Sequence, residues 1–484
     1  MYRKVGQRDT APENFELPFN GQLSLENRWV VMASIIPWQK YEDVYAINFS
    51  EERGAPALCF RMALGALIIK EKMGISDRET VEKIKENPYL QYFIGLESYN
   101  NQAPFDASIL VHFRERISTN LINQINLDMV KTQGEKKKDE EKKKPKNLEE
   151  IKEGKNQGKL IIDATCAPAD ISYPTDLNLL NQGRIKTEKI IDILYKTIKS
   201  QFQQKPITHR QTARKEYLKV AKKRRPTSRA IRKAIKKQLK YVSKNLTTIK
   251  LLIENGASLE SLSQRQYKTL LVVSEIYRQQ QWMWDEKQQR IEDRIVSINQ
   301  PHVRPIVRGK AGKSTEFGAK LSASCIDGYV FLHRISWDNY NESGDLKAQV
   351  EEFKNYTGHY PESIHADQIY RTRENRKFCK EKGIRISGPP LGRPPKNIDK
   401  KMKKQAQLDE RLRNHIEGKF GQAKRGFSLG KVMAKLSETS VTAIAITFLV
   451  INLSTLLKEA FSLFLYFFAE QIVFAVYLMI LTYN

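Results

Sequence analysis

The chain has 484 residues, and 82 Lys and Arg against 55 Asp and Glu give it a formal charge of +27. At ~100–200 residues per domain this length predicts about two to four domains, and 40% hydrophobic residues indicate a globular protein. The charge predicts a polyanionic partner, nucleic acid first and an anionic membrane surface second. The four cysteines lie far apart without a CxxC pattern, which argues against a disulfide scaffold or a Cys/His zinc site.

After an N-terminal segment of residues 1–19, residues 20–125 are predicted to form an all-helical domain. Ser76 and Glu79 have the spacing of a capping box, in which each side chain satisfies a backbone N–H at a helix start. Further on, Arg114 lies beside the apolar face of another predicted helix. Short helices with exposed arginines suit a DNA-binding helix-turn-helix domain, and a plain helical domain fits the pattern equally well.

A charged linker over residues 126–159 separates this domain from a predicted short strand at the start of segment 160–185. Residues 186–297 are predicted to form long helices. Within 205–244, 16 Lys and Arg stand against one acid, Glu216, whereas a solvated helix face normally mixes signs. We therefore expect phosphate contacts that do not depend on DNA sequence. The residues we assign to them are Lys222, Lys223, Arg224, Arg225, Arg232 and Lys236.

Residues 298–457 are predicted to alternate strands and helices. Two period-two stretches flank Asp327-Gly328, a strong hairpin signal because glycine tolerates positive φ. The further elements are a helix near 346–353, a strand at 363–366, a helix at 372–382, a strand at 384–386 and a helix at about 405–425. Together with the strand at 160–162, this is the element order of an RNase H-like α/β core: a mixed five-stranded sheet flanked by helices, with the basic helical region inserted after the first strand.

Three acids occupy positions that suit metal-dependent phosphodiester chemistry. We expect Asp163 and Asp367 each to end a strand, and Glu417 to lie on the late charged helix. In an RNase H-like sheet the first and fourth strands are neighbours, so the two aspartates can converge and the helix can bring the glutamate. Each acid alone could be a cap or a surface charge. Together they predict a carboxylate site for Mg²⁺ or Mn²⁺, with two ions as in two-metal phosphoryl-transfer sites.

The helix around Glu417 adds two cations. Arg413 lies four residues before Glu417 and Lys424 seven after it, so all three fall within roughly 40–60° of one face at about 100° per residue. A metal-binding carboxylate beside two cations suits a bound DNA end whose phosphates the cations hold. Ordinary charge pairs on a solvated helix would give the same pattern.

The sequence resembles bacterial insertion-sequence DDE transposases over most of residues 20–457. The resembling segments are Leu160–Thr165, Val303–Lys310, Glu316–Lys320, Ala366–Tyr370 and Arg413–Phe420, together with the N-terminal helical region. The resemblance implies that Asp163, Asp367 and Glu417 form the metal-binding DDE triad. Family members often carry a Tyr-x₂-Arg-x₃-Glu-x₆-Lys signature, and the chain departs from it with Glu410 at the tyrosine position.

The resemblance implies a DNA transposase that cuts element ends by metal-dependent hydrolysis and joins the 3′-OH to target DNA. Its partners would be terminal inverted repeats, target DNA and further copies of the chain, in a homodimer or larger synaptic complex in the bacterial cytoplasm at the nucleoid. Two alternatives stay open: a metal-dependent nuclease without strand transfer, and an inactive copy that only binds DNA or associates with a membrane.

The C-terminal tail, residues 458–484, has no counterpart in this pattern. Within it, residues 461–484 carry one charge, Glu470, and are long enough to span a membrane. A buried terminal helix or an assembly surface explains the same composition. We therefore expect no membrane partner, although the composition of this tail would also allow insertion into a membrane.

Overall fold

The computed structural model of the protein describes residues 11–17, 21–49, 56–142, 156–307, 315–389 and 400–482, with side chains except at residue 12 and in 135–142 and 463–482. The chain divides into two compact units. The first comprises residues 1–167, 320–335 and 340–484, and the second comprises residues 168–319 and 336–339. The basic helical region thus belongs to a unit inserted into the one that carries the three acids.

The N-terminal part of the first unit is all helical, as the sequence predicts. Its helices are α1 (Arg28–Ile35), α2 (Trp38–Ala46), α3 (Phe60–Met73), α4 (Asp77–Glu86), α5 (Pro88–Phe93) and α6 (Ile109–Arg116). Ser76 caps α4, because its Oγ accepts a hydrogen bond from the Glu79 N–H at 3.2 Å. The Glu79 carboxylate lies 3.8 Å from Lys83 Nζ, so the expected capping serine is confirmed while the glutamate pairs along the helix.

The predicted linker begins as helix rather than as irregular chain. Helix α7 runs from Thr119 to Lys142, across the domain boundary expected at residue 125 and through the first part of the charged stretch. Its buried residues Leu121, Ile122 and Ile125 explain this difference, because their packing fixes the start of a helix that the charged residues then continue. The rest of the predicted linker, residues 143–155, lies outside the described residues.

The α/β part of the chain contains a mixed sheet with six described strands, one more than expected. The strands are β1 (Lys159–Pro168), β2 (Arg304–Val307), β3 (Thr315–Ile326), β4 (Tyr329–Ser336), β5 (Ser363–Ala366) and β6 (Arg385–Ile386). Their order is β2-β3-β1-β5-β6, and β4 pairs with β3. The additional strand β2 pairs antiparallel with the start of β3. The predicted hairpin between β3 and β4 is confirmed, because Asp327 and Gly328 both have positive φ, 49° and 86°.

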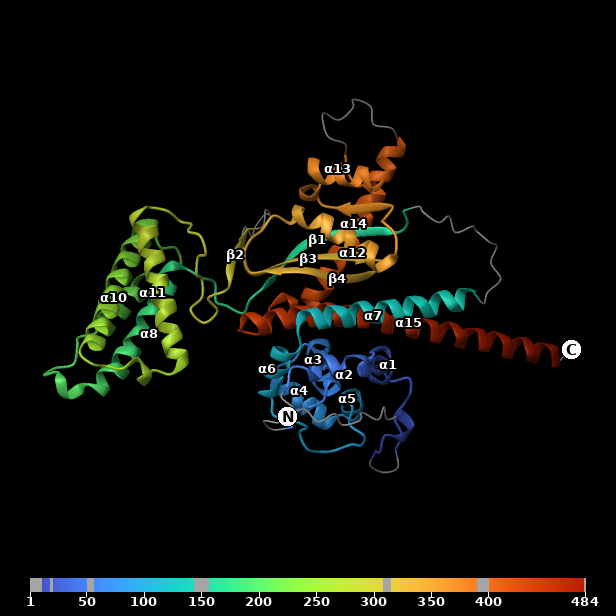
Figure 1. The fold of residues 1–484 in the computed structure, drawn as a ribbon, viewed down its shortest axis with the longest axis horizontal. Helices are drawn as coiled ribbons and strands as arrows, with labels where there is room; N and C mark the ends of the chain where they lie inside the picture. Colours follow the sequence, from blue (N-terminus) through green and yellow to red (C-terminus); the bar gives the residue numbers. More distant parts are fainter. Residues whose placement is uncertain are drawn as a thin grey trace. The chain divides into compact units, whose positions relative to one another are not determined.

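Strands β1 and β5 lie side by side although about 200 residues separate them in the sequence. They pair in parallel, and β5 continues the same pattern to β6. Leu160, Ile161 and Ile162 are all buried, as are the four residues of β5, which is typical of parallel strands covered on both faces. Figure 1 shows β1 among the central strands, with α12 (Leu346–Thr357) and α14 (Lys400–Gly426) against the sheet.

Helix α15 (Ser437–Thr482) ties the N-terminal helices to the sheet within the first unit. It packs along α7, as Figure 1 shows, and also contacts α3 and α6. The buried Asn452 donates to Asn126 Oδ1 of α7 at 2.9 Å and accepts from the Val330 N–H of β4 at 2.9 Å. One buried amide therefore joins α7, α15 and the sheet.

The apolar C-terminal stretch begins inside this packing. Among the described residues one segment, Ser437–Ser462, is long and apolar enough to cross a membrane, and 83% of its apolar 18-residue window is buried within the protein. The core helix of a globular protein has the same composition, so burial accounts for the hydropathy of this segment. The expected tail of residues 461–484 lies mostly beyond the described side chains; α15 itself continues to Thr482.

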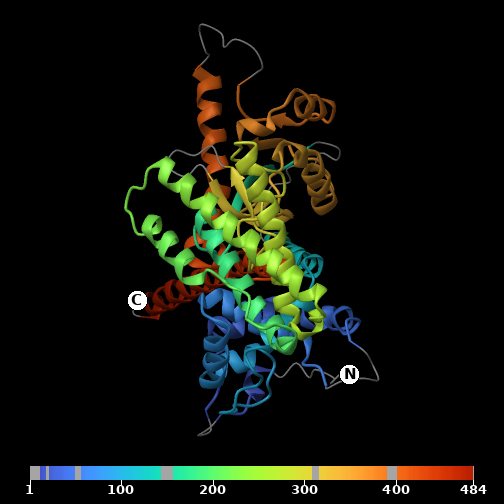
Figure 2. The ribbon, with the colours of Figure 1, turned by 90° about the vertical axis from the view of Figure 1, so that its left-hand side faces the viewer.

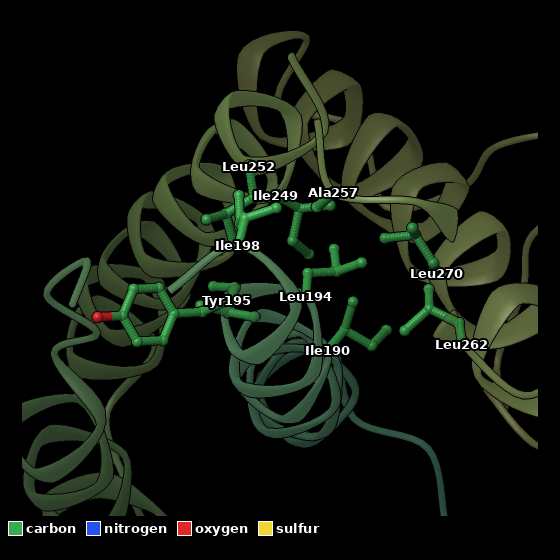
Figure 3. Close-up of a cluster of buried hydrophobic side chains, with 10 residues drawn as sticks. Ile190, Leu194, Tyr195, Ile198, Ile249, Leu252, Ala257, Leu262 and Leu270 are labelled. Carbon is green, nitrogen blue, oxygen red and sulfur yellow. The ribbon is translucent and has the colours of Figure 1, made fainter. Parts of the chain in front are cut away.

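The second unit is a helical bundle of α8 (Asp176–Thr197), α9 (Arg210–Ala221), α10 (Ser228–Glu254) and α11 (Gln264–Asp285). Helices α8, α10 and α11 lie side by side in both views (Figures 1 and 2). Figure 3 shows one of their cores, where Ile190 and Leu194 of α8 meet Leu252 of α10 and Leu270 of α11. The predicted insertion is confirmed as helical, and its first helix begins ten residues earlier than expected.

We predict that Asn452→Ala lowers the free energy of unfolding by about 2–4 kcal/mol, because it leaves the buried Val330 N–H and the Asn126 carboxamide oxygen without their partner. Urea unfolding followed by circular dichroism measures the change. Asn355→Ala, at an exposed position of α12, serves as the control and should change the midpoint little. Equal midpoints for the two variants would contradict the role of Asn452.

Candidate active site

Asp163 and Asp367 lie next to each other because of the register between β1 and β5. Ile162 is paired with Ala366, so each aspartate is the next residue on neighbouring parallel strands, whose spacing is about 4.8 Å. Asp367 directly follows β5, as predicted. Asp163 does not end its strand, since β1 continues to Pro168; it lies where the pairing with β5 stops. The Asp163 carboxylate accepts from the Ala164 N–H at 2.8 Å and that of Asp367 from the Gln368 N–H at 2.6 Å.

Helix α14 is held against this edge of the sheet by an ion pair between the buried Asp409 and the exposed Arg385. The Asp409 carboxylate accepts two hydrogen bonds from Arg385 of β6, at 2.7 and 2.9 Å, and lies 3.5 Å from His365 Nδ1 of β5. Burial raises the pKa of Asp409, but the hydrogen bonds from Arg385 and Gln405 outweigh it and the pKa is lowered. Two turns further along α14, the buried Ile416 and Phe420 face the protein interior and place Glu417 beside them.

The Glu417 carboxylate pairs with Arg413 one turn earlier, at 2.7 Å. The same guanidinium binds Glu410 at 2.6 Å, so Arg413 lies between two glutamates. Glu410 occupies the position where the family signature has tyrosine, and here it takes up part of the charge of the signature arginine. Arg413 is thus engaged with acids of its own helix in the conformation described.

The pKa of Asp163 shows that the three predicted acids act on one another. Burial, together with the negative charges of Glu417 and Asp367, raises the pKa of Asp163 to about 6, although the Ala164 N–H and Arg413 act to lower it. The acids come from β1, from the end of β5 and from α14, three segments far apart in sequence. The fold therefore brings the predicted site residues into one electrostatic neighbourhood.

The donor types at this site fit a hard divalent cation, and the conformation does not yet form a coordination shell. Carboxylate oxygens are the ligands that Mg²⁺ and Mn²⁺ prefer, and the mutual repulsion that raises the pKa of Asp163 is what a cation would relieve. Within the described ranges, however, no three His, Cys, Asp or Glu side chains lie close enough to hold one ion. The Glu417 carboxylate is directed to Arg413 instead.

The predicted DNA contacts separate into two locations. Lys424, on the last turns of α14, lines a cavity of about 990 Å³ whose lining does not include the three acids. The other basic residues lie in the second unit: Lys222 to Arg225 connect α9 to α10, and Arg232 and Lys236 lie one turn apart on α10. All six are exposed. Elsewhere in this segment charge is neutralised, as where Lys237 and Tyr241 bind Glu216.

Two arginines were missed from the sequence. Arg385 anchors Asp409, and Arg371 donates to the Ala366 carbonyl at 2.8 Å, directly beside Asp367. Arg371 reaches this place because Gly388 has no side chain: a Cβ there would lie 2.1 Å from the Arg371 guanidinium. Arg371 is four residues after Asp367 in a segment without regular periodicity. Its nearness to Asp367 in the sequence is therefore the one signal that could have identified it as a neighbour of the site.

We predict that Asp163→Asn stabilises the protein at neutral pH in buffer with a chelator. The folded-state pKa of about 6 lies above the ordinary value of 3.8, so the wild-type protein loses stability as pH rises from about 4 to about 6. The variant should lack this loss and gain about 3 kcal/mol at pH 7.5, measured by thermal unfolding across pH. Asp338→Asn, at an exposed carboxylate, should keep the wild-type profile; the same profile in Asp163→Asn would contradict the assignment.

Comparison with known proteins gives matches at both ends of the chain. Residues 364–454, which include β5, α14 and much of α15, match the family described as Transposase DDE domain. Residues 18–116, the N-terminal helices, match the family described as Transposase domain (DUF772). A protein of Rhizobium meliloti named Uncharacterized protein ORF8 in nfe locus is 29% identical over 174 residues, which cover 36% of this chain and 75% of that protein. No solved structure matches. The two family matches, one to a transposase DDE domain and one to a transposase domain, support an insertion-sequence DDE transposase.

Proposed function

We propose that this chain cuts the ends of an insertion sequence by metal-dependent hydrolysis and joins the 3′-OH to target DNA. The observation that carries the proposal is the coupling of Asp163, Asp367 and Glu417 within a chain whose two ends match transposase domains. The strand order β4-β3-β1-β5-β6 supports an RNase H-like core, since the first strand lies beside the fourth of the five expected strands. The pairing of Ile162 with Ala366, which directly precede Asp163 and Asp367, also supports the proposal.

In this proposal Asp163, Asp367 and Glu417 hold Mg²⁺ or Mn²⁺, with two ions. When bound, the ions activate the attacking oxygen and stabilise the leaving oxygen of the phosphodiester. Asp163 is ionised above about pH 6 and is oriented by the Ala164 N–H, and Asp367 is oriented by the Gln368 N–H. Both carboxylates are thus aimed by backbone donors before substrate arrives, so little reorganisation is left for the chemical step.

Arg413 would change partners during the reaction. It neutralises Glu417 in the conformation described, at 2.7 Å, and a Glu417 that turns towards Asp163 releases it. The freed guanidinium lies beside the site and can bind a DNA phosphate through two hydrogen bonds. Lys424 would hold the strand further along α14. The remaining contact with Glu410 holds Arg413 in place and limits how far it can reach.

DNA would be gripped by the exposed basic residues of the second unit, and the N-terminal domain would read the terminal repeat. Work on two element ends implies a homodimer or a larger synaptic complex in the bacterial cytoplasm. One observation favours the alternative of a nuclease without strand transfer or of an inactive copy: Glu410 replaces the signature tyrosine and occupies the signature arginine.

We predict that Asp163→Asn, Asp367→Asn and Glu417→Gln each reduce Mg²⁺-dependent cleavage of a duplex with the element's flanking ends by at least 10³-fold while DNA binding persists. A pre-cut labelled end tests joining: wild type should yield joined products, whereas hydrolysis alone would favour the nuclease. Glu438→Gln is the control, an exposed carboxylate in the first turn of α15 and outside the triad, and should retain cleavage. Wild-type cleavage rates in all three triad variants would refute the site.

We predict that replacing Lys222, Lys223, Arg224 and Arg225 together by Gln weakens duplex binding and reduces its salt dependence. Each lost phosphate contact should lower the slope of log K against log[salt] by ~0.9. Fluorescence anisotropy at several salt concentrations measures both effects. The control replaces four other exposed lysines of the same unit, Lys196, Lys199, Lys250 and Lys268. If both sets of substitutions lower the slope alike, the effect is one of net charge and the proposed contact is wrong.

A further inference from the structure

A cavity of about 990 Å³ lies within the first unit, between the helices of the N-terminal transposase domain and the segment that follows the catalytic helix. One wall is the α3–α4 turn, residues 70–78. The other is the end of α14, the turn η7 (Ser428–Gly430) and the start of α15. The two families matched at the two ends of the chain therefore each supply one wall.

The lining of this cavity is strongly basic. Two acids and six basic residues line it; the basic residues are Lys70, Arg78, Arg114, Lys424, Arg425 and Lys431. Both acids already have partners. Asp77 pairs with Arg114 at 2.5 Å, and the buried Glu71 accepts from the Ser428 N–H at 2.8 Å and from the Thr447 hydroxyl at 2.6 Å. An excess of positive charge is left facing the cavity.

The walls are held in place by hydrogen bonds to Glu71 and by the close approach of Gly430 to α14. Glu71 joins α3 to η7 and α15 through its two hydrogen bonds. Gly430 lies so close to the end of α14 that a Cβ there would meet the Lys424 carbonyl at 2.4 Å, so the turn can fold back only with glycine. The cavity is therefore a formed feature of the fold and not a gap between loosely packed segments.

Position and lining both suit a DNA strand. Lys424 follows Glu417 by seven residues, about 10 Å along α14 at 1.5 Å per residue, so the cavity begins about two helical turns from the candidate active site. Met73, Val432 and Met433 add apolar surface to the basic lining. The cations can bind the phosphates of DNA, and the apolar side chains can pack against its sugars.

We propose that this cavity binds the sugar–phosphate backbone of DNA near the scissile region, so that the N-terminal domain and the catalytic domain hold one strand jointly. The inference rests on the proposed function, which identifies the bound DNA as the substrate. It adds a binding site in which Lys70, Arg78 and Arg425 are the new DNA contacts. Contact with backbone rather than bases predicts affinity without sequence preference.

Lysine acetylation followed by mass spectrometry tests the proposal on the full chain, with a 40-base-pair duplex of random sequence as probe. We expect Lys70 and Lys431 to react at least fivefold more slowly with DNA bound. Lys354 and Lys380, exposed on α12 and α13 (Arg373–Glu381), should react equally in both states. Unchanged reactivity of Lys70 and Lys431 under saturating DNA would overturn the proposal.

Substitution provides the second measurement. Lys70→Gln, Arg78→Gln and Arg425→Gln together should weaken duplex binding at least tenfold at 0.1 M salt. The charge-conserving substitutions Lys70→Arg, Arg78→Lys and Arg425→Lys should keep the wild-type affinity. The matched control is Lys354→Gln, Lys377→Gln and Lys380→Gln, which removes the same charge elsewhere in the unit. Equal affinity of the two triple variants would overturn the inference. If DNA protects Lys70 from acetylation but the protein cleaves no DNA, the proposed function alone is refuted. If the protein cleaves DNA normally but DNA does not protect Lys70, only the proposed binding of DNA in the cavity is refuted.

Discussion

The parallel pairing of β1 with β5 is the constraint on which the candidate site depends. It joins residues about 200 positions apart, and its register of Ile162 with Ala366 sets Asp163 beside Asp367. A slip of one residue would turn one of the two carboxylates to the opposite face of the sheet. The pairing is secured by burial of both strands, so hydrophobic packing determines where the acids meet.

The third acid depends on a different kind of interaction. Helix α14 carries no strand register, and the ion pair of the buried Asp409 with the exposed Arg385 fixes how far along the sheet it lies. Removing Arg385 would be costly, because the carboxylate of Asp409 would stay buried without its main partner. The candidate site therefore combines a register set by apolar packing with a helix position set by charge. Asp409 helps to hold α14, the helix that carries Glu417.

Positive charge is divided among three places with different surroundings. In the second unit it is exposed and lies on a helix and its preceding turn, as at Lys222 and Lys236. At Arg413 it is held between two glutamates, and around Lys424 it lines a formed cavity. The net charge of +27 is thus distributed over surroundings that differ in their partners and in their neighbouring elements.

The sequence by itself determined the kinds of elements and was enough to predict the three acids as candidate site residues. Local signals suffice for these: the Asp327-Gly328 turn, the helical periods of the inserted unit and the buried runs of β1 and β5 all depend on neighbouring residues. It could not place the strand β2, the continuation of β1 beyond Asp163 or the helical start of the charged linker, which follow from pairing and packing with distant segments. Only the tertiary structure decided that Glu417 rests on Arg413, that Arg371 crosses Gly388 and that Lys424 faces a shared cavity, because those contacts join residues that no periodicity relates.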